Sequence, residues 1–220
     1  AVLVGRPIQV EATISALLAD PLWKRLVDPA RIGVAGFSAG GYTSLLLVGA
    51  VPRFRRFIDY CNRYAGDTIC AEAPRIEAEA KRQGRSLEQF MDDLQAQLTR
   101  WGPPADSRVK AAFAMAPLSL VFDAAGAGAI DRPVFLYYGD ADRVLRPDEN
   151  AARLAPLVPT LVGLKPVAGA DHWVFIPPCS PELAKDDPMI CADSPGVSRA
   201  ALHAQIQADA LSFFRATLHV

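Results

Sequence analysis

Apolar residues follow two alternating spacings along the chain, which predicts strands and helices in turn. Four short, nearly continuous apolar runs are typical of buried strands, at residues 32–35, 109–115, 133–138 and 160–167. Apolar positions three and four apart predict helices around them, at residues 10–23, 42–50, 147–157 and 198–218. Because strands that alternate with helices pair in parallel and carry helices on both faces, the chain is predicted to be an α/β protein with a mostly parallel sheet.

Residues 52–107 interrupt this alternation. The segment predicts a charged helix at 74–83 and a second helix that begins after Ser86, a residue type that favours the N-cap position. The apolar stripe of the second helix consists of Leu87, Phe90, Met91, Leu94, Leu98 and Trp101. We interpret 52–107 as a helical insertion that packs on the main sheet. Packing is the expected role of the stripe, with lining of an acyl pocket by Phe90 and Trp101 as the alternative.

The strongest chemical signal is a glycine-rich corner between a predicted strand and a predicted helix. Its sequence is Gly36-Phe37-Ser38-Ala39-Gly40-Gly41, a G-x-S-x-G pattern. A nucleophile at the tip of a strand must turn sharply into a helix, so side chains at Gly36 and Gly40 are expected to obstruct the turn. The corner would present the Ser38 hydroxyl above the sheet and aim the Ala39 amide at a developing oxyanion. A tight turn with an idle serine is the alternative.

A serine hydroxyl near neutral pH needs a base, and the base needs an orienting acid. Candidates for both follow later strands, since Asp142 comes after the third apolar run and His172 after the fourth. The carboxyl ends of parallel strands lie at one edge of a sheet, where ligand sites form. We therefore predict that Asp142 and His172 converge on Ser38.

Other acids and histidines have alternative interpretations. Asp140 is the second candidate for the acid, but its carboxylate is equally suited to binding backbone amides in a turn. Asp171 adjoins the candidate base, and chain neighbours rarely orient toward each other, while Asp123 is an outside candidate. His203 lies in the last predicted helix and His219 beside the end of the sequence, so surface or packing positions explain both.

With nucleophile, acid and base in this order, the chain resembles the α/β-hydrolase superfamily. Within it, the chain is similar to the predicted dienelactone hydrolase group related to platelet-activating-factor acetylhydrolases. The segments that carry the resemblance are RIGVAGFSAGGYT (31–43), GDADRV (139–144) and GADHWVF (169–175), continuing through Pro178-Cys179 and Ile190-Cys191 to the closing helix. The resemblance implies a serine esterase or lipase-type acyl hydrolase, with Ser38 as nucleophile, Asp142 as acid and His172 as base.

Two departures from the family patterns narrow the expected substrate. Dienelactone hydrolases proper carry a cysteine at the corner, where this chain has Ser38. In platelet-activating-factor acetylhydrolases the acid follows the strand after the nucleophile, but here that strand ends near Met115 without a carboxylate. We therefore expect a general small-molecule or lipid-like ester, contacted by Phe37 and Trp173, with no metal or organic cofactor. The alternatives are a non-catalytic hydrolase-like binding protein and a peptidase or acyltransferase on the same scaffold.

The position of the corner is unusual for this superfamily, whose members place several strands before it. Here Ser38 follows only one predicted helix, and four strands would leave the strand of the corner at an open, hydrophobic edge. We therefore expect that N-terminal strands are missing and that residues 1–220 are the C-terminal part of one α/β-hydrolase domain. The predicted partner is an N-terminal fragment of the same precursor, which would supply a second oxyanion donor.

Composition and charge exclude several other classes of protein. The 220 residues are 51% hydrophobic and 21% charged, which argues against a disordered chain. A net charge of −1 provides no basic field for nucleic acid. No apolar run reaches the roughly 20 residues that span a bilayer, so no transmembrane segment is predicted.

Four cysteines allow three pairings, of which the local pairs Cys61–Cys70 and Cys179–Cys191 are favoured. Each local pair spans a short polar stretch, and none of the four lies in a periodic apolar segment. The three histidines are not spaced with the cysteines as zinc ligands would be. Disulfides would indicate a periplasmic or secreted protein, and free thiols, the alternative, a cytoplasmic one.

Overall fold

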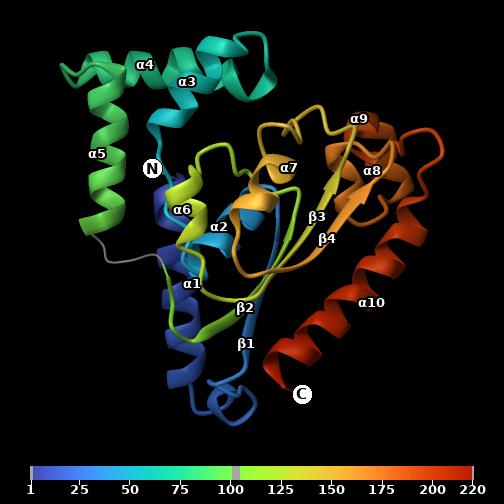
Figure 1. Cartoon of the computed structure of the whole chain (residues 1–220). Helices are drawn as coiled ribbons and strands as arrows, with labels where there is room; N and C mark the ends of the chain where they lie inside the picture. The colour runs from blue at the N-terminus through green and yellow to red at the C-terminus, as the bar shows by residue number, and fades with distance from the viewer. Residues whose placement is uncertain (1, 101–104, 220) are drawn as a thin grey trace.

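A four-stranded parallel sheet forms the centre of the protein in a computed structural model that describes residues 2–100 and 105–219 (Figure 1). Its strands are β1 (Ile32–Phe37), β2 (Val109–Met115), β3 (Val134–Gly139) and β4 (Leu161–Val167). They lie in the order β1-β2-β3-β4, and every neighbouring pair is parallel. The predicted α/β class and parallel sheet are therefore confirmed.

The side chains of the strands alternate between two apolar layers, because successive strand residues point to opposite faces. On one face, Ala112 of β2 belongs to a core that includes Tyr42 and Leu45 to Leu47 of α2 (Ala39–Leu47). On the other face, Phe113 packs against α10 (Arg199–Leu218), with its ring centroid 6.0 Å from that of Phe213. Helices thus cover both faces of the sheet, with α10 running diagonally across one of them (Figure 1).

The N-terminal helix, α1 (Val2–Ala19), begins and ends earlier than the predicted range 10–23. The carboxylate of Asp20 accepts hydrogen bonds from two following backbone amides, at 2.8 and 3.1 Å, which replaces the next helical turn. Pro21 disfavours helical geometry at the residue before it and reinforces this end. The helix also contains Pro7, which conceals its first turns from a sequence-based prediction.

The described residues of the segment 52–107 are mostly helical, as predicted. Its helices are α3 (Arg55–Arg63), α4 (Ala73–Arg82) and α5 (Leu87–Arg100). On α5, Met91 and Leu98 are buried, which confirms the packing role of the apolar stripe at these positions. Trp101 lies outside the described residues.

The packing of this insertion differs from the prediction, because it does not lie on the sheet. Its helix α5 contacts α1, α3 and α4, while α2 covers the adjacent face of β1 and β2 (Figure 1). The insertion is joined to the loop after β2 by two hydrogen bonds: the Arg53 amide donates to the carbonyl of Val121 and the Arg56 guanidinium to that of Leu120, at 2.7 and 2.8 Å. At Met91 and Leu98 the stripe is therefore buried at the side of the domain.

The helix predicted at 147–157 is reduced to α7 (Ala151–Leu154) and a following 3₁₀ turn. The buried side chain of Asn150 explains the late start, since its Oδ1 accepts hydrogen bonds from the amides of Ser119 and Leu120, both at 2.9 Å. These bonds tie Asn150 to the loop after β2 and hold its backbone outside helical geometry.

Short elements complete the chain. The helices are α6 (Ala124–Gly128), α8 (Pro181–Asp186) and α9 (Pro188–Cys191). The 3₁₀ turns are η1 (Trp23–Arg25), η2 (Thr68–Glu72), η3 (Ala155–Leu157) and η4 (His172–Phe175). No helix in the described ranges has the length and apolar character needed to cross a bilayer.

Two disulfides join the cysteines in the predicted local pairs. Cys61–Cys70 links α3 to η2 in the insertion, and Cys179–Cys191 closes the loop that carries α8 and α9. Both pairings are confirmed. Because disulfides persist in oxidising surroundings, they indicate an extracellular or otherwise oxidising location.

The strand order places β1, the strand of the glycine-rich corner, at an edge of the sheet that the described residues form. Ala35 in its middle is exposed, and the other residues of β1 are partly exposed, whereas most of β2 is buried. An edge of this kind leaves backbone groups open to pairing with another strand.

Candidate active site

Ser38 joins β1 to α2 in a backbone conformation that few residues adopt. Its φ is 56° and its ψ is −117°. Such a conformation costs about 1–3 kcal/mol and persists only where surrounding structure fixes it. Here the Ser38 amide donates to the carbonyl of Met115 at 2.9 Å, and its carbonyl accepts from the amides of Tyr42 and Leu118, both at 3.1 Å. The partly buried hydroxyl is therefore held at the carboxyl end of β1.

Two glycines make this corner possible, and one of them is not among those the sequence singled out. A Cβ on Gly36 would lie 2.2 Å from the carbonyl oxygen of Gly40, and one on Gly41 would lie 2.9 Å from the Cα of Pro117. A Cβ on Gly40, in contrast, would meet nothing closer than the guanidinium of Arg6 at 4.0 Å. The expectation for Gly40 is wrong, because a side chain there would point into open space.

Gly36→Ala is therefore expected to lower the free energy of unfolding by about 3 kcal/mol or more, since its Cβ would overlap backbone that cannot yield. Gly40→Ala is the matched control, expected to be neutral or stabilising by up to about 1 kcal/mol because Ala favours helices. Urea denaturation of the two variants measures the difference. Equal stabilities would contradict this account of the corner.

The side chains of Ser38, His172 and Asp142 form one hydrogen-bonded chain. His172 Nε2 lies 3.0 Å from Ser38 Oγ, and His172 Nδ1 lies 2.7 Å from Asp142 Oδ2. The side chains of His172 and Asp142 are each only 1% exposed. An ionised Asp142 can only accept, so Nδ1–H donates to it and Nε2 is left to accept the proton of the Ser38 hydroxyl. The structure thus brings together three residues that are far apart in the sequence.

Both carboxylate oxygens of Asp142 are engaged, which fixes its orientation. While Oδ2 faces the imidazole, Oδ1 accepts hydrogen bonds from the amides of Val144 and Leu145, at 2.9 and 2.7 Å. The two amides belong to the loop that follows β3, and so the backbone of this loop aims the carboxylate at His172.

Asp140 and Asp171 join the loop after β3 to the loop after β4. Asp140 Oδ1 accepts a hydrogen bond from the amide of Gly169 at 2.7 Å, so its carboxylate binds a backbone amide as expected, but one in the loop after β4 and not in its own turn. Asp171 accepts from the amides of Arg143 and His172, at 3.0 and 2.7 Å, and from Arg143 Nε at 2.7 Å. The candidate acid and the candidate base thus lie on loops that are bonded to each other.

The charge of Asp171 is maintained by these bonds. Burial alone would raise the pKa of its carboxyl, but the amides of Arg143 and His172 and the Arg143 guanidinium together hold that pKa below its ordinary value. Because the pKa is lowered in the folded state, the link between the two loops stabilises the fold at pH values above the ordinary pKa of an aspartate. This stabilisation is lost as the pH falls through the lowered pKa.

The other sequence candidates lie elsewhere or have other contacts. Asp123 caps α6 through a hydrogen bond from the amide of Gly126 at 2.6 Å. His203 Nε2 lies 2.9 Å from the carbonyl oxygen of Val174, and His219 ends α10. Across residues 2–100 and 105–219, no group of three or more histidine, cysteine, aspartate or glutamate side chains is arranged to hold a metal ion.

Aromatic rings surround the imidazole. The Phe37 ring centroid lies 4.7 Å from that of His172, and the Trp173 centroid lies 5.2 Å from it. Phe37 also contacts Phe175, so it forms part of an apolar cluster behind the base. Its predicted contact with substrate stays a prediction.

The Ala39 amide is available for an anion. Ala39 is the first residue of α2, where backbone N–H groups have no acceptor within the helix. It directly follows Ser38, so a charge that develops on an oxygen of a carbon bonded to Ser38 Oγ would form near the positive end of the helix dipole.

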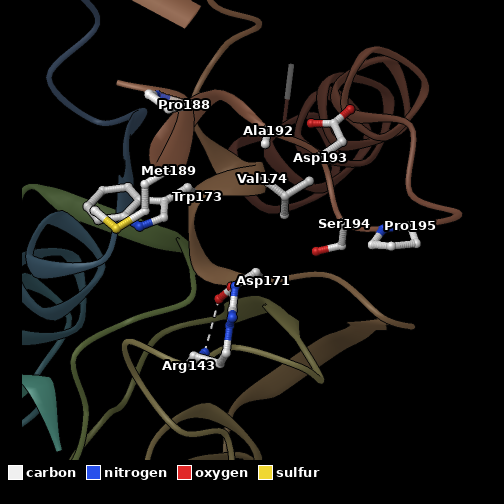
Figure 2. A pocket seen from close by; sticks show the side chains of 10 residues that line it. All are labelled: Arg143, Asp171, Trp173, Val174, Pro188, Met189, Ala192, Asp193, Ser194 and Pro195. Carbon is white, nitrogen blue, oxygen red and sulfur yellow. Dashed lines mark hydrogen bonds and ion pairs between the residues drawn. The ribbon is translucent and has the colours of Figure 1, made fainter. Parts of the chain in front are cut away.

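A cavity of about 250 Å³ lies beside the His172 loop, and Trp173 lines it (Figure 2). Arg143 and Asp171 line the same cavity, as does Met189 of α9. The sequence identified Trp173 as a substrate contact but gave no such role to the other three, although it named Asp171 as a candidate acid. Arg143 and Asp171 adjoin the candidate acid and base in the sequence, while nothing in the local pattern points to Met189.

A comparison with protein-family models and with curated proteins finds no match to this chain.

Proposed function

We propose that this protein is a serine hydrolase that cleaves carboxylic esters through an acyl-enzyme on Ser38. The observation that carries the proposal is the chain of hydrogen bonds from Ser38 Oγ to His172 Nε2 and from His172 Nδ1 to Asp142 Oδ2. This arrangement of hydroxyl, imidazole and buried carboxylate is the one that activates a serine for acyl transfer. The strained backbone at Ser38 supports the proposal, because such conformations cluster at functional sites.

In the first step, His172 Nε2 takes the Ser38 proton as Oγ bonds to the carbonyl carbon of the ester. The π electrons of the carbonyl move to its oxygen, and the Ala39 amide donates a hydrogen bond to the resulting oxyanion. Asp142 stabilises the imidazolium. When the intermediate collapses, the bond to the alcohol oxygen breaks and His172 returns its proton to that oxygen. The products are a free alcohol and acyl-Ser38.

In the second step, His172 Nε2 takes a proton from water as the water oxygen attacks the acyl carbon. Collapse of the second intermediate breaks the bond to Ser38 Oγ, which recovers its proton from His172. The carboxylic acid leaves and the site is restored. His172, Asp142 and Ala39 have the same roles in both steps, so the proposed chemistry needs no metal or organic cofactor.

We propose further that the fold is the α/β-hydrolase fold. The sequential parallel strands, the sharp corner after β1 and the helix that follows it support this assignment. The partly exposed edge at β1 supports the related proposal that strands from a preceding segment of the same precursor pair there. This part of the proposal predicts that mass spectrometry of active material purified from its source shows an additional fragment. Active material that consists of the 23.6 kDa chain alone would contradict the preceding segment but not the proposed reaction.

We propose that the protein is periplasmic or secreted. The two disulfides support this, because both compartments are oxidising. Fractionation of the source cells tests this part of the proposal. Recovery of the protein with reduced cysteines from the cytoplasm would contradict it.

Hydrolysis of p-nitrophenyl acetate and butyrate, compared with aminoacyl p-nitroanilides, tests the proposed reaction. We expect ester hydrolysis with a kcat/KM at least 100-fold above that for the anilides. A complete folded protein, with any preceding segment present, that hydrolyses neither would indicate a binding protein, and preference for the anilides would indicate a peptidase.

A further inference from the structure

The cavity beside the His172 loop has a firmly held wall. Met189 lies on α9, which Cys191 ends, and the Cys179–Cys191 disulfide closes the loop that carries it. Behind the disulfide, the side chain of Arg199 is 3% exposed and donates to Asp193 Oδ1 at 2.8 Å and to the carbonyl oxygen of Ile190 at 3.0 Å. A disulfide and a buried arginine thus fix the segment 190–193, next to Met189.

The size of the cavity suits one part of a substrate. Whole ligand pockets usually measure about 300–1,000 Å³, and this one measures about 250 Å³. In Figure 2, Trp173 and Met189 lie together on the left side of the cavity, Ser194 and Pro195 on the right, and Arg143 with Asp171 below. A volume of this size accommodates a single alkyl chain or ring.

The charges around the cavity favour an uncharged occupant. The carboxylate of Asp171 is paired with Arg143, and that of Asp193 with Arg199. Each fixed charge therefore has its partner already, and an added charge would be buried against a completed pair. The apolar surface, in contrast, is open, since the Met189 side chain is 72% exposed. A flexible, polarisable methionine at such a position adapts to apolar ligands of varied shape.

The chemistry of the proposed reaction determines which half of an ester would lie here. The departing alcohol oxygen receives its proton from His172 Nε2, so the alcohol portion leaves on the His172 side of the site. Asp171, Trp173 and Val174, which line the cavity, all lie within two residues of His172 in the chain. The acyl portion stays bonded to Ser38 Oγ, at the start of α2.

We infer that this cavity binds the uncharged, apolar alcohol portion of the substrate ester, with Met189 and Trp173 as the residues that determine alcohol specificity. The inference rests on the proposed function and deepens it. It identifies the substrates as esters of apolar alcohols larger than methanol, such as linear alkyl or arylalkyl alcohols.

Two variants test the inference with acetate esters of methanol, hexanol and phenethyl alcohol. Met189→Ala removes apolar contact, and Ala192→Trp fills the cavity from an exposed position on its wall. Each is expected to lower kcat/KM for the hexyl and phenethyl esters about tenfold, the scale of a lost apolar contact in a pocket, and to change that for methyl acetate less than about twofold. Leu183→Ala is the matched control, because Leu183 is an exposed apolar residue inside the same disulfide loop but does not line the cavity.

A series of methyl esters with lengthening acyl chains separates the two halves of the substrate. We expect the ratio of variant to unsubstituted kcat/KM to stay constant along this acyl series. A ratio that changes with the acyl chain instead of the alcohol, or equal effects of Leu183→Ala and Met189→Ala, would overturn the inference while the proposed function stands. Absence of ester hydrolysis by the complete unsubstituted protein, with any preceding segment present, would overturn both.

Discussion

Replacing Ser38 with alanine is expected to lower kcat for p-nitrophenyl ester hydrolysis by at least about 10⁴-fold, as removal of a triad serine does elsewhere. The variant loses the Ser38 Oγ atom, which lies 3.0 Å from His172 Nε2. Within the described residues, this is the one hydrogen bond found for Nε2. Without it no acyl-enzyme can form, and the amide of residue 39 can only assist a direct attack by water. The substitution is not expected to change the fold, because the hydrogen bonds that hold the corner are made by the Ser38 backbone and not by its hydroxyl.

Ser44→Ala is the matched control for this variant. Ser44 lies on the same helix, and its hydroxyl donates to the carbonyl of Gly40 at 3.0 Å within that helix. We expect its kcat to stay within about threefold of the unsubstituted value, because a surplus helical hydrogen bond contributes about 1 kcal/mol to stability and nothing to acyl transfer. Equal activities of Ser38→Ala and the unsubstituted protein would exclude Ser38 as the nucleophile.

Asp142→Asn is expected to lower kcat by about 10³–10⁴-fold with little loss of stability. The amide oxygen of Asn can still accept from Val144 and Leu145, as Asp142 Oδ1 does, so the loop keeps its shape. The amide nitrogen would then face His172 Nδ1 and donate to it. That bond moves the imidazole proton to Nε2, where it blocks acceptance of the Ser38 proton.

Asp140→Asn separates the two candidate acids. The Asp140 carboxylate accepts from the Gly169 amide, which an asparagine oxygen can also do, and so we expect a change of less than about fivefold in kcat from a weakened hydrogen bond. Steady-state kinetics of both variants at one pH measure the contrast. A larger loss in Asp140→Asn than in Asp142→Asn would reverse the assignment of the acid.

The strands could be predicted from the sequence because each is a short apolar run with turn residues beside it. Helices were less predictable where their ends depend on side chains from elsewhere. Asn150 bonds to the loop after β2 and delays α7, and Pro7 conceals the first turns of α1. The packing of the insertion depends on where α1 lies, which no local pattern reports.

The residues of the candidate site could be predicted better than the contacts that hold them in place. Ser38, Asp142 and His172 follow strand ends, and parallel strands bring such ends to one edge. The link between Arg143 and Asp171 could not be predicted, because it joins side chains across two loops and depends on their exact approach in space. The wall of the cavity that includes Met189 could not be predicted either, because it depends on the Cys179–Cys191 disulfide and on Arg199.

The central claim is that Ser38 is an activated nucleophile, and covalent labelling tests it most directly. The complete folded protein, with any preceding segment present and both disulfides intact, is incubated with a fluorophosphonate, digested, and analysed by mass spectrometry for the modified peptide. We expect a single adduct on Ser38, formed by Oγ attack on phosphorus with loss of fluoride, and no adduct in Ser38→Ala or after denaturation. No adduct on the folded protein, or an adduct on another serine that persists in Ser38→Ala, would contradict the account.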